Sequence, residues 1–432
     1  MVHLKVERPI VAAVRRPPRA RKRSDYPQVA VEHLDVAERL ASPLLMGPPL
    51  CDELIALVEH MVDQREAAVM RHLRAFRPRS PATVAKAERI PEAEAAEVLA
   101  RLGDQRGIIV SAGTPARPKY MLMPIVPGIF EMTLIRTRPD QLSPWHHRFA
   151  ELFEALYETG YLIDYFNPSA APIVRYLPVG EANLDVHPMA LPTDMLEAEL
   201  DRFEHFAVGP CQCRLASRVV GRDCGKPLDN CLVIGQWAQE ASRRGIVRAV
   251  SRNEALAVKR EAEEHGLVNW MMNVGATKSQ SSCSCCGCCC HAMRTVIEFN
   301  APAFFAPPRF LPRCRDEQCT GCGRCARICP MNAIAIEPRT TSHEPDDEQQ
   351  TSSDDRCPSQ SVSAHRPIGF AWIHRAERCV GCGLCAVHCR PAKLISMEPA
   401  FRVKPYRSWF SLALHAAPGM FRGLWQAWRR RP

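Results

Sequence analysis

Cysteine is the residue whose spacing in this chain most directly indicates chemistry. Two groups of four near the carboxyl end each follow the spacing C-x2-C-x2-C-x3-C. The first comprises Cys319, Cys322, Cys325 and Cys329, and the second comprises Cys379, Cys382, Cys385 and Cys389. Thiolates at this spacing hold [4Fe-4S] clusters. A zinc ribbon of paired C-x2-C knuckles fits poorly, because the third spacing is tight and a proline lies near the end of each run.

The two runs belong to a longer internal repeat. Residues 314–337 can be laid over residues 374–398, and glycines flank the second cysteine of both runs. Glycine lets a loop approach closely enough to wrap a cluster with its amides pointing inward. Each copy ends in a short apolar stretch suited to a strand. The sequence therefore predicts two similar cluster-binding units.

Residues 308–399 resemble the bacterial-type two-cluster ferredoxins. The resemblance implies a ferredoxin-like (βαβ)2 domain, placed at 299–399, with two [4Fe-4S] clusters and crossed ligation. One cluster would be held by Cys319, Cys322, Cys325 and Cys389, and the other by Cys379, Cys382, Cys385 and Cys329. The sequence departs from the family in two places. Arg390 precedes the second proline, and a polar insertion at 338–367 predicts a flexible loop.

More thiols lie in the middle of the chain. A C-x-C-x10-C-x6-C pattern offers enough ligands for one cluster: Cys211, Cys213, Cys224 and Cys231. The run SSCSCCGCCC adds six, of which the candidate ligands are Cys283, Cys285, Cys286 and Cys288. Neighbouring cysteines point in different directions, so six such thiols cannot all close on one cube. The pattern predicts one or two additional iron-sulfur clusters, with a structural zinc site as the alternative.

The segments around these thiols predict a mainly helical middle domain over residues 128–298. Apolar spacing and capping signals indicate helices at 144–159, 193–206, 232–244 and 251–266. Ser251 and Glu254 have the S-x-x-E form of a capping box. Helices between the cysteine groups could bring those groups together.

Residues 49–127 predict a different domain. Helices between residues 52 and 102 precede a strand pair within 107–126, which is the order of a winged helix. A helix-turn-helix pattern raises the option of DNA binding. The would-be recognition helix carries Glu92, Glu94 and Glu97 against Arg101, and these carboxylates would repel phosphate. We therefore interpret this domain as a structural or protein-docking module and do not expect DNA as a partner.

The two ends of the chain carry its net charge of +9, and the body between them is mildly acidic. Residues 1–48 are predicted to form a basic, disordered tail. Residues 400–432 interleave tryptophan and phenylalanine with arginine, as an interfacial helix does. This segment is too short and too broken by Pro418-Gly419 to span a bilayer. It predicts either packing on the protein's own body or peripheral membrane contact.

Missing motifs narrow the function. No G-x-G-x-x-G, G-x4-G-K-[ST], H-E-x-x-H or G-x-S-x-G motif occurs, so no nucleotide cofactor and no catalytic residue is predicted. The 21 cysteines, without a secretory signal or a spanning apolar run, predict a reducing cytoplasm.

We predict an α+β iron-sulfur protein that exchanges electrons with a redox partner protein. The arrangement of domains also resembles multidomain ferredoxin-like proteins with a winged-helix head. Two other functions stay open. A cluster-dependent reductase would have its substrate site at 211–290, and a redox-sensing regulator would couple cluster loss to DNA binding by the winged helix.

Overall fold

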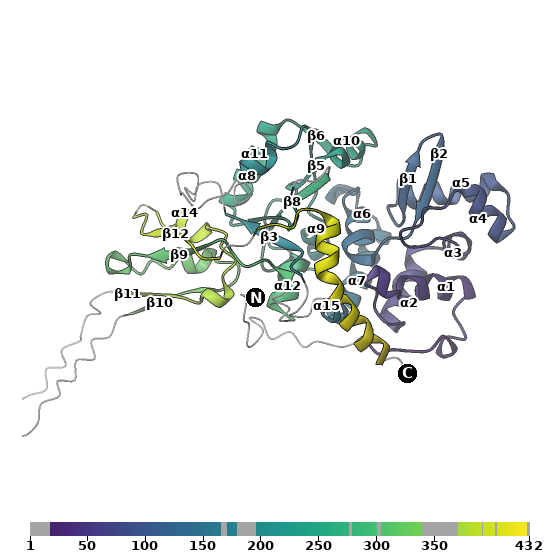
Figure 1. The fold of residues 1–432 in the computed structure, drawn as a ribbon, viewed down its shortest axis with the longest axis horizontal. Coiled ribbons are helices and arrows are strands. Elements are labelled where there is room, and N and C mark those ends of the chain that lie inside the picture. Colours follow the sequence, from purple (N-terminus) through teal and green to yellow (C-terminus); the bar gives the residue numbers. More distant parts are fainter. Residues whose placement is uncertain are drawn as a thin grey trace, which may run out of the picture.

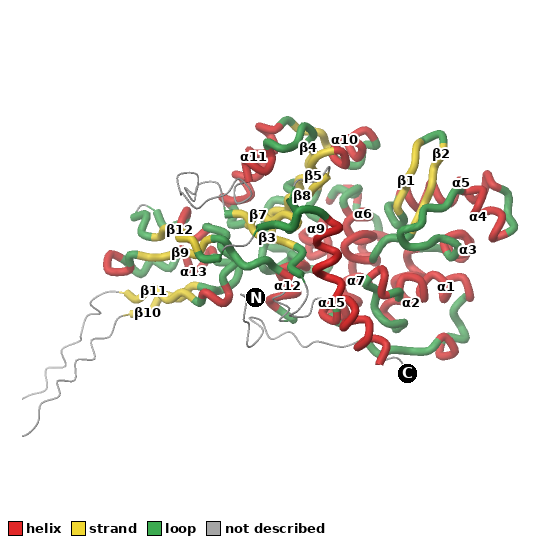
Figure 2. Tube along the Cα trace, viewed as in Figure 1, coloured by secondary structure: helices red, strands yellow, loops and turns green. Residues whose placement is uncertain are grey.

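The structure is a computed structural model of the chain. It describes residues 18–165, 171–178, 196–275, 279–299, 304–338, 370–390, 392–401 and 404–429. Helices and strands both contribute, in agreement with the predicted α+β class. Figures 1 and 2 show a helix-rich end that includes one strand pair, a centre of mixed helices and strands, and further strands at the opposite end.

The head of the protein is helical apart from one hairpin. Its first helices are α1 (Val31–Leu40), α2 (Asp52–Met61), α3 (Gln64–Met70), α4 (Pro81–Glu88) and α5 (Glu92–Ala100). Strands β1 (Val110–Thr114) and β2 (Arg117–Met121) follow and pair antiparallel. From α2 onward this is the order of helices and strands predicted from the sequence.

Helix α1 corrects the prediction that residues 1–48 form a disordered tail. Its apolar face, including Leu34, Ala37 and Leu40, is buried in the hydrophobic core of the head. Spacing by three and four residues places these side chains on one face of a helix. The tail prediction is therefore wrong for residues 18–48, and residues 1–17 lie outside the described residues.

The core of the head also continues past the predicted boundary at residue 127. Helices α6 (Phe130–Leu134) and α7 (Pro144–Glu158) bury Phe130, Phe149 and Leu156 in the same core as α1 and α2. Helix α7 begins with a proline at its first position, where no intrahelical donor is lost. The hydrophobic core of the head therefore continues across residue 127, where the sequence predicted a domain boundary.

The middle domain contains a six-stranded antiparallel sheet in addition to its helices, and the prediction of a mainly helical domain missed this sheet. The strand order is β3-β7-β8-β5-β4-β6. The strands are β3 (Val174–Leu177), β4 (Phe206–Gly209), β5 (Cys231–Gly235), β6 (Arg248–Val250), β7 (Val268–Met272) and β8 (Ser279–Cys285). The helices of this domain are α8 (Leu196–Leu200), α9 (Gln212–Val219), α10 (Gln236–Arg243), α11 (Arg252–Glu264) and α12 (His291–Ile297).

The error arose at the segment predicted as a helix over 232–244. Its first part is the central strand β5, all of whose residues are buried, and the helix begins only at Gln236. A short apolar run of this kind fits a buried strand as well as a helix, so periodicity does not separate the two. By contrast, α11 begins after Ser251 with the predicted capping box to Glu254.

The carboxyl-terminal part repeats a strand-helix-strand unit. The first unit is β9 (Phe310–Cys314), α13 (Arg324–Ile328) and β10 (Ile334–Pro338), and the second is β11 (Phe370–His374), α14 (Leu384–Val387) and β12 (Ile395–Pro399). Strand β9 pairs with β12 and β10 pairs with β11, all antiparallel. The two copies therefore exchange strand partners. The predicted insertion at 338–367 falls, except for Pro338, outside the described residues.

The chain closes with helix α15 (Trp409–Arg429), which continues through Pro418. Tyr406, just before it, forms a bridge to Val274 beside the central sheet. Among the described residues, no helix combines the length and apolar character needed to cross a bilayer.

Candidate metal centres

The second cysteine run and the last cysteine of the first run line one cavity. Cys379, Cys382, Cys385 and Cys329 all contribute to its wall, and most other lining side chains are apolar. Backbone amides point at sulfur here: Ala333 N donates to Cys329 Sγ at 3.3 Å, and Gly381 N donates to Cys379 Sγ at 3.4 Å. Burial raises the pKa of the Cys379 thiol to about 12, and a bound positive metal centre would favour its thiolate.

Two glycines fix how closely the cysteine loops approach the strands. Gly321 has a φ of +70° and Gly381 a φ of +69°, the left-handed region that glycine favours. A Cβ atom at Gly321 would lie 2.6 Å from the ring of Phe370, the first residue of β11. At Gly381 it would lie 2.5 Å from the carbonyl oxygen of Phe310, the first residue of β9. Each loop therefore packs on the first strand of the other copy.

The remaining cysteines of the two runs also come from both copies. Burial raises the pKa of the Cys325 thiol, and the nearby Cys389 and Cys319 raise it further. Cys325 and Cys385 are buried in one small apolar cluster against which Cys389 packs. Cys322 is exposed. One cysteine from each run thus lies in the core between α13 and α14.

Four thiols of the middle region converge tightly, and we call them the compact thiol set. The Sγ atoms of Cys224, Cys286, Cys288 and Cys289 all lie within 4.8 Å of one another. Among the described residues this is the one group of potential ligands packed so closely. Hydrogen bonds from Cys288 and Cys289 hold the pKa of Cys286 well below its ordinary value.

Five further thiols form a chain of contacts, which we call the extended thiol set: Cys213, Cys231, Cys283, Cys285 and Cys290. Cys231 and Cys285 lie near Cys283 and hold the pKa of its thiol well below the ordinary value. Cys213 and Cys285 lie near Cys290 and do the same to its thiol. The indole N–H of Trp270 donates to Cys285 Sγ at 2.7 Å.

The division into two sets corrects the grouping predicted from spacing. Cys211, Cys213, Cys224 and Cys231 were expected to complete one cluster, but Cys224 joins the compact set while Cys213 and Cys231 join the extended set. Cys211 lies next to the extended set. Burial raises the pKa of its thiol to about 11, and the nearby Cys283 and Cys290 raise it as well, whereas Arg214 opposes the shift. Cys289 and Cys290 belong to the two sets although neither was a candidate ligand.

Strand geometry explains why the run divides. Cys283 and Cys285 are two residues apart on β8 and point to the same face, because side chains alternate along a strand. Cys286 follows the strand end and joins the other set. A contiguous run of thiols therefore serves two sites.

Two buried cations accompany these thiols. Arg214, only 1% exposed, donates to the carbonyl oxygens of Pro227 and Ser284 at 2.9 and 2.8 Å. Burial alone would lower the pKa of Arg214, but neighbouring thiols, Cys211, Cys286 and Cys285, raise it above its ordinary value. Since Cys286 and Cys285 belong to different sets, Arg214 lies near both. It can offset negative charge at both.

Lys259 is the second cation. Its ammonium group donates to the carbonyl oxygen of Ser282 at 2.7 Å and to Ser284 Oγ at 3.0 Å. Burial lowers the pKa of Lys259 to about 8, although Cys283, Cys231 and Cys285 oppose that shift. Neither cation could be predicted from the sequence, because both lie on helices with ordinary amphipathic spacing.

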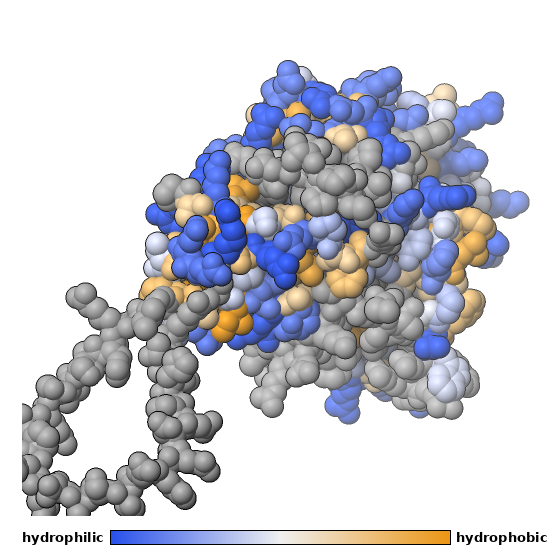
Figure 3. All heavy atoms as spheres, turned by 60° about the vertical axis from the view of Figure 1, so that its left-hand side comes forward, coloured by the Kyte–Doolittle hydropathy of each residue, from blue (hydrophilic) through white to orange (hydrophobic). Residues whose placement is uncertain are grey.

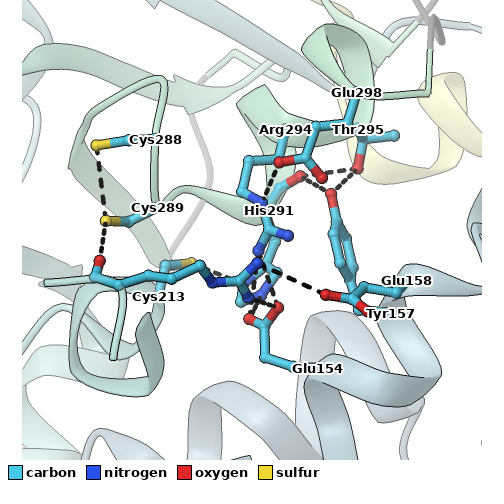
Figure 4. A network of polar contacts seen from close by, with 11 residues as sticks. Glu154, Tyr157, Glu158, Cys213, Cys288, Cys289, His291, Arg294, Thr295 and Glu298 are labelled. Atoms are coloured by element: carbon cyan, nitrogen blue, oxygen red, sulfur yellow. Dashed lines mark hydrogen bonds and ion pairs between the residues drawn. The ribbon is translucent and has the colours of Figure 1, made fainter. Parts of the chain in front are cut away.

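A buried carboxylate, Glu154 of α7, connects the thiol sets to the head (Figure 4). His291 Nε2 lies 2.5 Å from Glu154 Oε1, and His291 Nδ1 lies 3.3 Å from Cys213 Sγ. Arg294 reaches Glu154 Oε2 at 3.0 Å. Arg222 pairs with the same carboxylate, and its carbonyl oxygen accepts a hydrogen bond from Cys289 at 3.8 Å. Glu154 therefore touches neighbours of both sets.

Comparison with known proteins supports the iron-sulfur interpretation of the carboxyl-terminal part. Residues 318–392 match the 4Fe-4S dicluster domain family, and this range contains both cysteine runs. No curated protein and no solved structure matches the chain. The protein thus carries a ferredoxin-type 4Fe-4S domain near its carboxyl end, and the cysteine groups of its middle region are compatible with further clusters.

Proposed function

We propose that the protein is an iron-sulfur electron-transfer protein with two [4Fe-4S] clusters in the dicluster domain and a further cluster at the extended thiol set. The observation that carries this proposal is the single cavity lined by Cys329 together with Cys379, Cys382 and Cys385. Cys319, Cys322, Cys325 and Cys389 would hold the other cluster of the domain. When bound, such clusters accept and release one electron at a time.

The packing between the centres supports a path for electrons. Cys285 and Cys290 of the extended set lie in the same hydrophobic cluster as Cys379 and Cys382 of the dicluster domain. Tyr176 of β3 belongs to this cluster too. Burial raises the pKa of Tyr176, and thiols from both centres raise it further. A dry, continuous contact of this kind keeps two redox centres close and shielded from water.

We further propose that a redox partner docks at the dicluster end of the molecule. Figure 3 brings this end forward and shows hydrophobic patches between hydrophilic side chains. Cys322 is exposed on this domain, so the cluster that it would hold lies near the surface. A surface of apolar and polar side chains above a cluster close to solvent suits the small, transient interfaces of electron-transfer complexes.

The head is proposed as a winged-helix module that docks protein, not DNA. The order of α4, α5 and the β1-β2 hairpin supports the name, and the acidic side chains of α5 oppose DNA binding. Salt-sensitive binding of duplex DNA that changes on cluster loss would instead favour the redox-sensing regulator.

Helix α15 supports a proposal of peripheral membrane contact at the cytoplasmic face. Phe410, Leu414, Phe421 and Trp425 are 52 to 73% exposed. At 3.6 residues per turn they fall within an arc of about 60°. Leu412, on the opposite face, is only 4% exposed. The helix holds no acidic residue, so an anionic lipid surface would complement it.

Vesicle flotation tests this contact. The proposal expects binding to vesicles containing phosphatidylserine and much weaker binding to neutral vesicles. A Phe76→Ser variant is the control, because Phe76 is as exposed as the α15 side chains but lies on the head. Equal flotation with neutral and anionic vesicles would contradict the electrostatic part of the proposal.

A cluster-dependent reductase is the second candidate, and one observation favours it. His291 lies beside Cys213 of the extended set and pairs with the buried Glu154, so an imidazole–carboxylate pair adjoins this site. An incompletely ligated cluster there could bind substrate next to that pair. Turnover by the isolated protein with an artificial reductant would favour this function, whereas an electron carrier only passes electrons to a second protein.

Spectroscopy of protein purified without oxygen tests the main proposal. We expect the electron paramagnetic resonance signals of reduced [4Fe-4S] clusters. A Cys285→Ser variant should keep the signals of the two dicluster centres and lose a third. A chain without iron and acid-labile sulfide would refute the proposal.

A further inference from the structure

The compact thiol set differs from the other cysteine groups in its geometry. All four of its Sγ atoms lie within 4.8 Å of one another, and the Sγ atoms of Cys288 and Cys289 are 3.7 Å apart. Four sulfurs about 2.3 Å from one zinc ion at the corners of a tetrahedron would be about 3.8 Å apart. The observed spacing therefore matches thiolates that share a single ion.

The dicluster domain provides an internal comparison. Its cysteines surround a cavity, and among the described residues they form no group as tight as the compact set. This is expected, because each thiolate of a cube binds a different iron and the cube itself lies between them. The Sγ atoms of the compact set lie too close together to surround a cube. It fits one ion and not a cube.

We propose that Cys224, Cys286, Cys288 and Cys289 bind one zinc ion in a mononuclear, tetrahedral site. Four thiolates and no open position are typical of structural zinc. Tetrahedral sulfur ligation also favours zinc over metals that prefer oxygen ligands or planar nitrogen ligands. This site is separate from the proposed electron-transfer centres.

The position of the site indicates what the ion does. Cys224 lies in the irregular segment between α9 and β5, and the other three ligands lie between β8 and α12. The ion would join these two segments, which are far apart in the sequence. Cys286 and Cys289 are 2% and 1% exposed and pack with Ala262 and Leu267, so one side of the site is closed by apolar side chains.

This clamp also fixes a residue of the neighbouring polar network. Arg222 lies two residues before Cys224 and pairs with Glu154. The Arg222 carbonyl oxygen lies 3.8 Å from Cys289 Sγ, and this hydrogen bond would be lost when Cys289 binds zinc as a thiolate. Holding Cys224 on the ion would restrain Arg222 beside Glu154 through the short chain between them. The zinc site thus stabilises the wall beside the extended thiol set without taking part in electron transfer.

Adjacent cysteines provide a matched pair of variants. Cys285 belongs to the extended set and Cys286 to the compact set, so Cys286→Ser should remove zinc and leave iron and sulfide, while Cys285→Ser should do the opposite. Cys288→Ser repeats the zinc test at an exposed ligand, where misfolding does not confuse the outcome. Zinc, iron and acid-labile sulfide are measured on the full chain purified without oxygen.

The wild-type chain should contain one zinc ion, and zinc-edge X-ray absorption should show four sulfur neighbours at about 2.3 Å. The Cys288→Ser chain should lose that zinc at unchanged iron and sulfide. Wild-type protein without zinc, or a Cys288→Ser chain that loses iron and sulfide together, overturns the proposal. Failure of the electron-transfer function is distinguishable, because it would appear as missing iron and sulfide in the wild type.

Discussion

Replacing Glu154 by glutamine tests the buried network that links the head to the thiol sets. The carboxylate is 5% exposed and accepts from Arg294, which is 2% exposed, and from Arg222 and His291. Burial alone would raise the pKa of the Glu154 carboxyl, but these three neighbours outweigh burial and hold its pKa well below its ordinary value. The ionised carboxylate therefore stabilises the fold.

The magnitude follows from what the substitution leaves behind. Glu154→Gln keeps the shape but removes the charge. The buried guanidinium of Arg294 keeps Glu298 as a counter-ion at 2.6 Å, so the cost stays below that of an uncompensated buried charge and should be about 2–3 kcal/mol. The matched control is Glu158→Gln on the same helix. Glu158 lies 3.6 Å from Arg222, and both side chains are about half exposed, so its loss should cost about 0–1 kcal/mol.

The assay is urea unfolding under anaerobic conditions, followed by far-ultraviolet circular dichroism. At pH 7 the Glu154→Gln chain should unfold at clearly lower urea than the wild type and the Glu158→Gln chain. The sign of the pH dependence follows from the lowered pKa. The contribution of Glu154 is complete above the ordinary carboxyl pKa of 4.5 and is lost as the pH falls below it, so the gap should narrow there. Equal unfolding of both variants at pH 7 would refute the reasoning.

Three other predictions concern the clusters and α15. Trp270→Phe removes a donor to the sulfur of the extended set, which should lower the potential of its cluster by roughly 40 mV in a redox titration, and an unchanged potential contradicts this. Cys329→Ala and Cys382→Ala should each remove about four irons, and the double variant no more, because both residues serve one cluster. Additive loss would exclude crossed ligation. Phe410→Ser with Phe421→Ser should weaken binding to anionic vesicles roughly a hundredfold in flotation assays, and unchanged binding would show that α15 does not insert.

Much of the carboxyl-terminal part could be predicted because its information is local. The ligand spacing, the flanking glycines and the repeat all lie within short windows, and the structure shows the repeated strand-helix-strand units. The meeting of Cys329 with the second run could not be derived from spacing alone. It depends on the exchange of strand partners between the two copies.

The middle domain was harder because its sites are built by distant pairings. Cys231 meets Cys283 because β5 and β8 are neighbours in the sheet, and no sequence pattern encodes that pairing. The six-stranded sheet was missed because strands β3, β4 and β5 are short and buried along their whole length, so their residues do not alternate between apolar and polar. Alternation along β8 could have separated Cys283 and Cys285 from Cys286 had a strand been predicted there.

The helices of the head could be predicted, because amphipathic spacing is a local signal. The capping box at Ser251 in the middle domain was predicted correctly from a local signal too. The order of residues 18–48 was missed because basic, proline-containing ends suggested disorder. The apolar face of α1 outweighs that composition once the core of the head is present to receive it.

The most direct test of the central claim is a count of iron and acid-labile sulfide in the full chain purified without oxygen. Three clusters predict about twelve of each, of which about eight should survive in the Cys285→Ser variant. A colourless chain, or one that contains zinc but no acid-labile sulfide, would contradict the assignment of the dicluster domain and with it the proposed function.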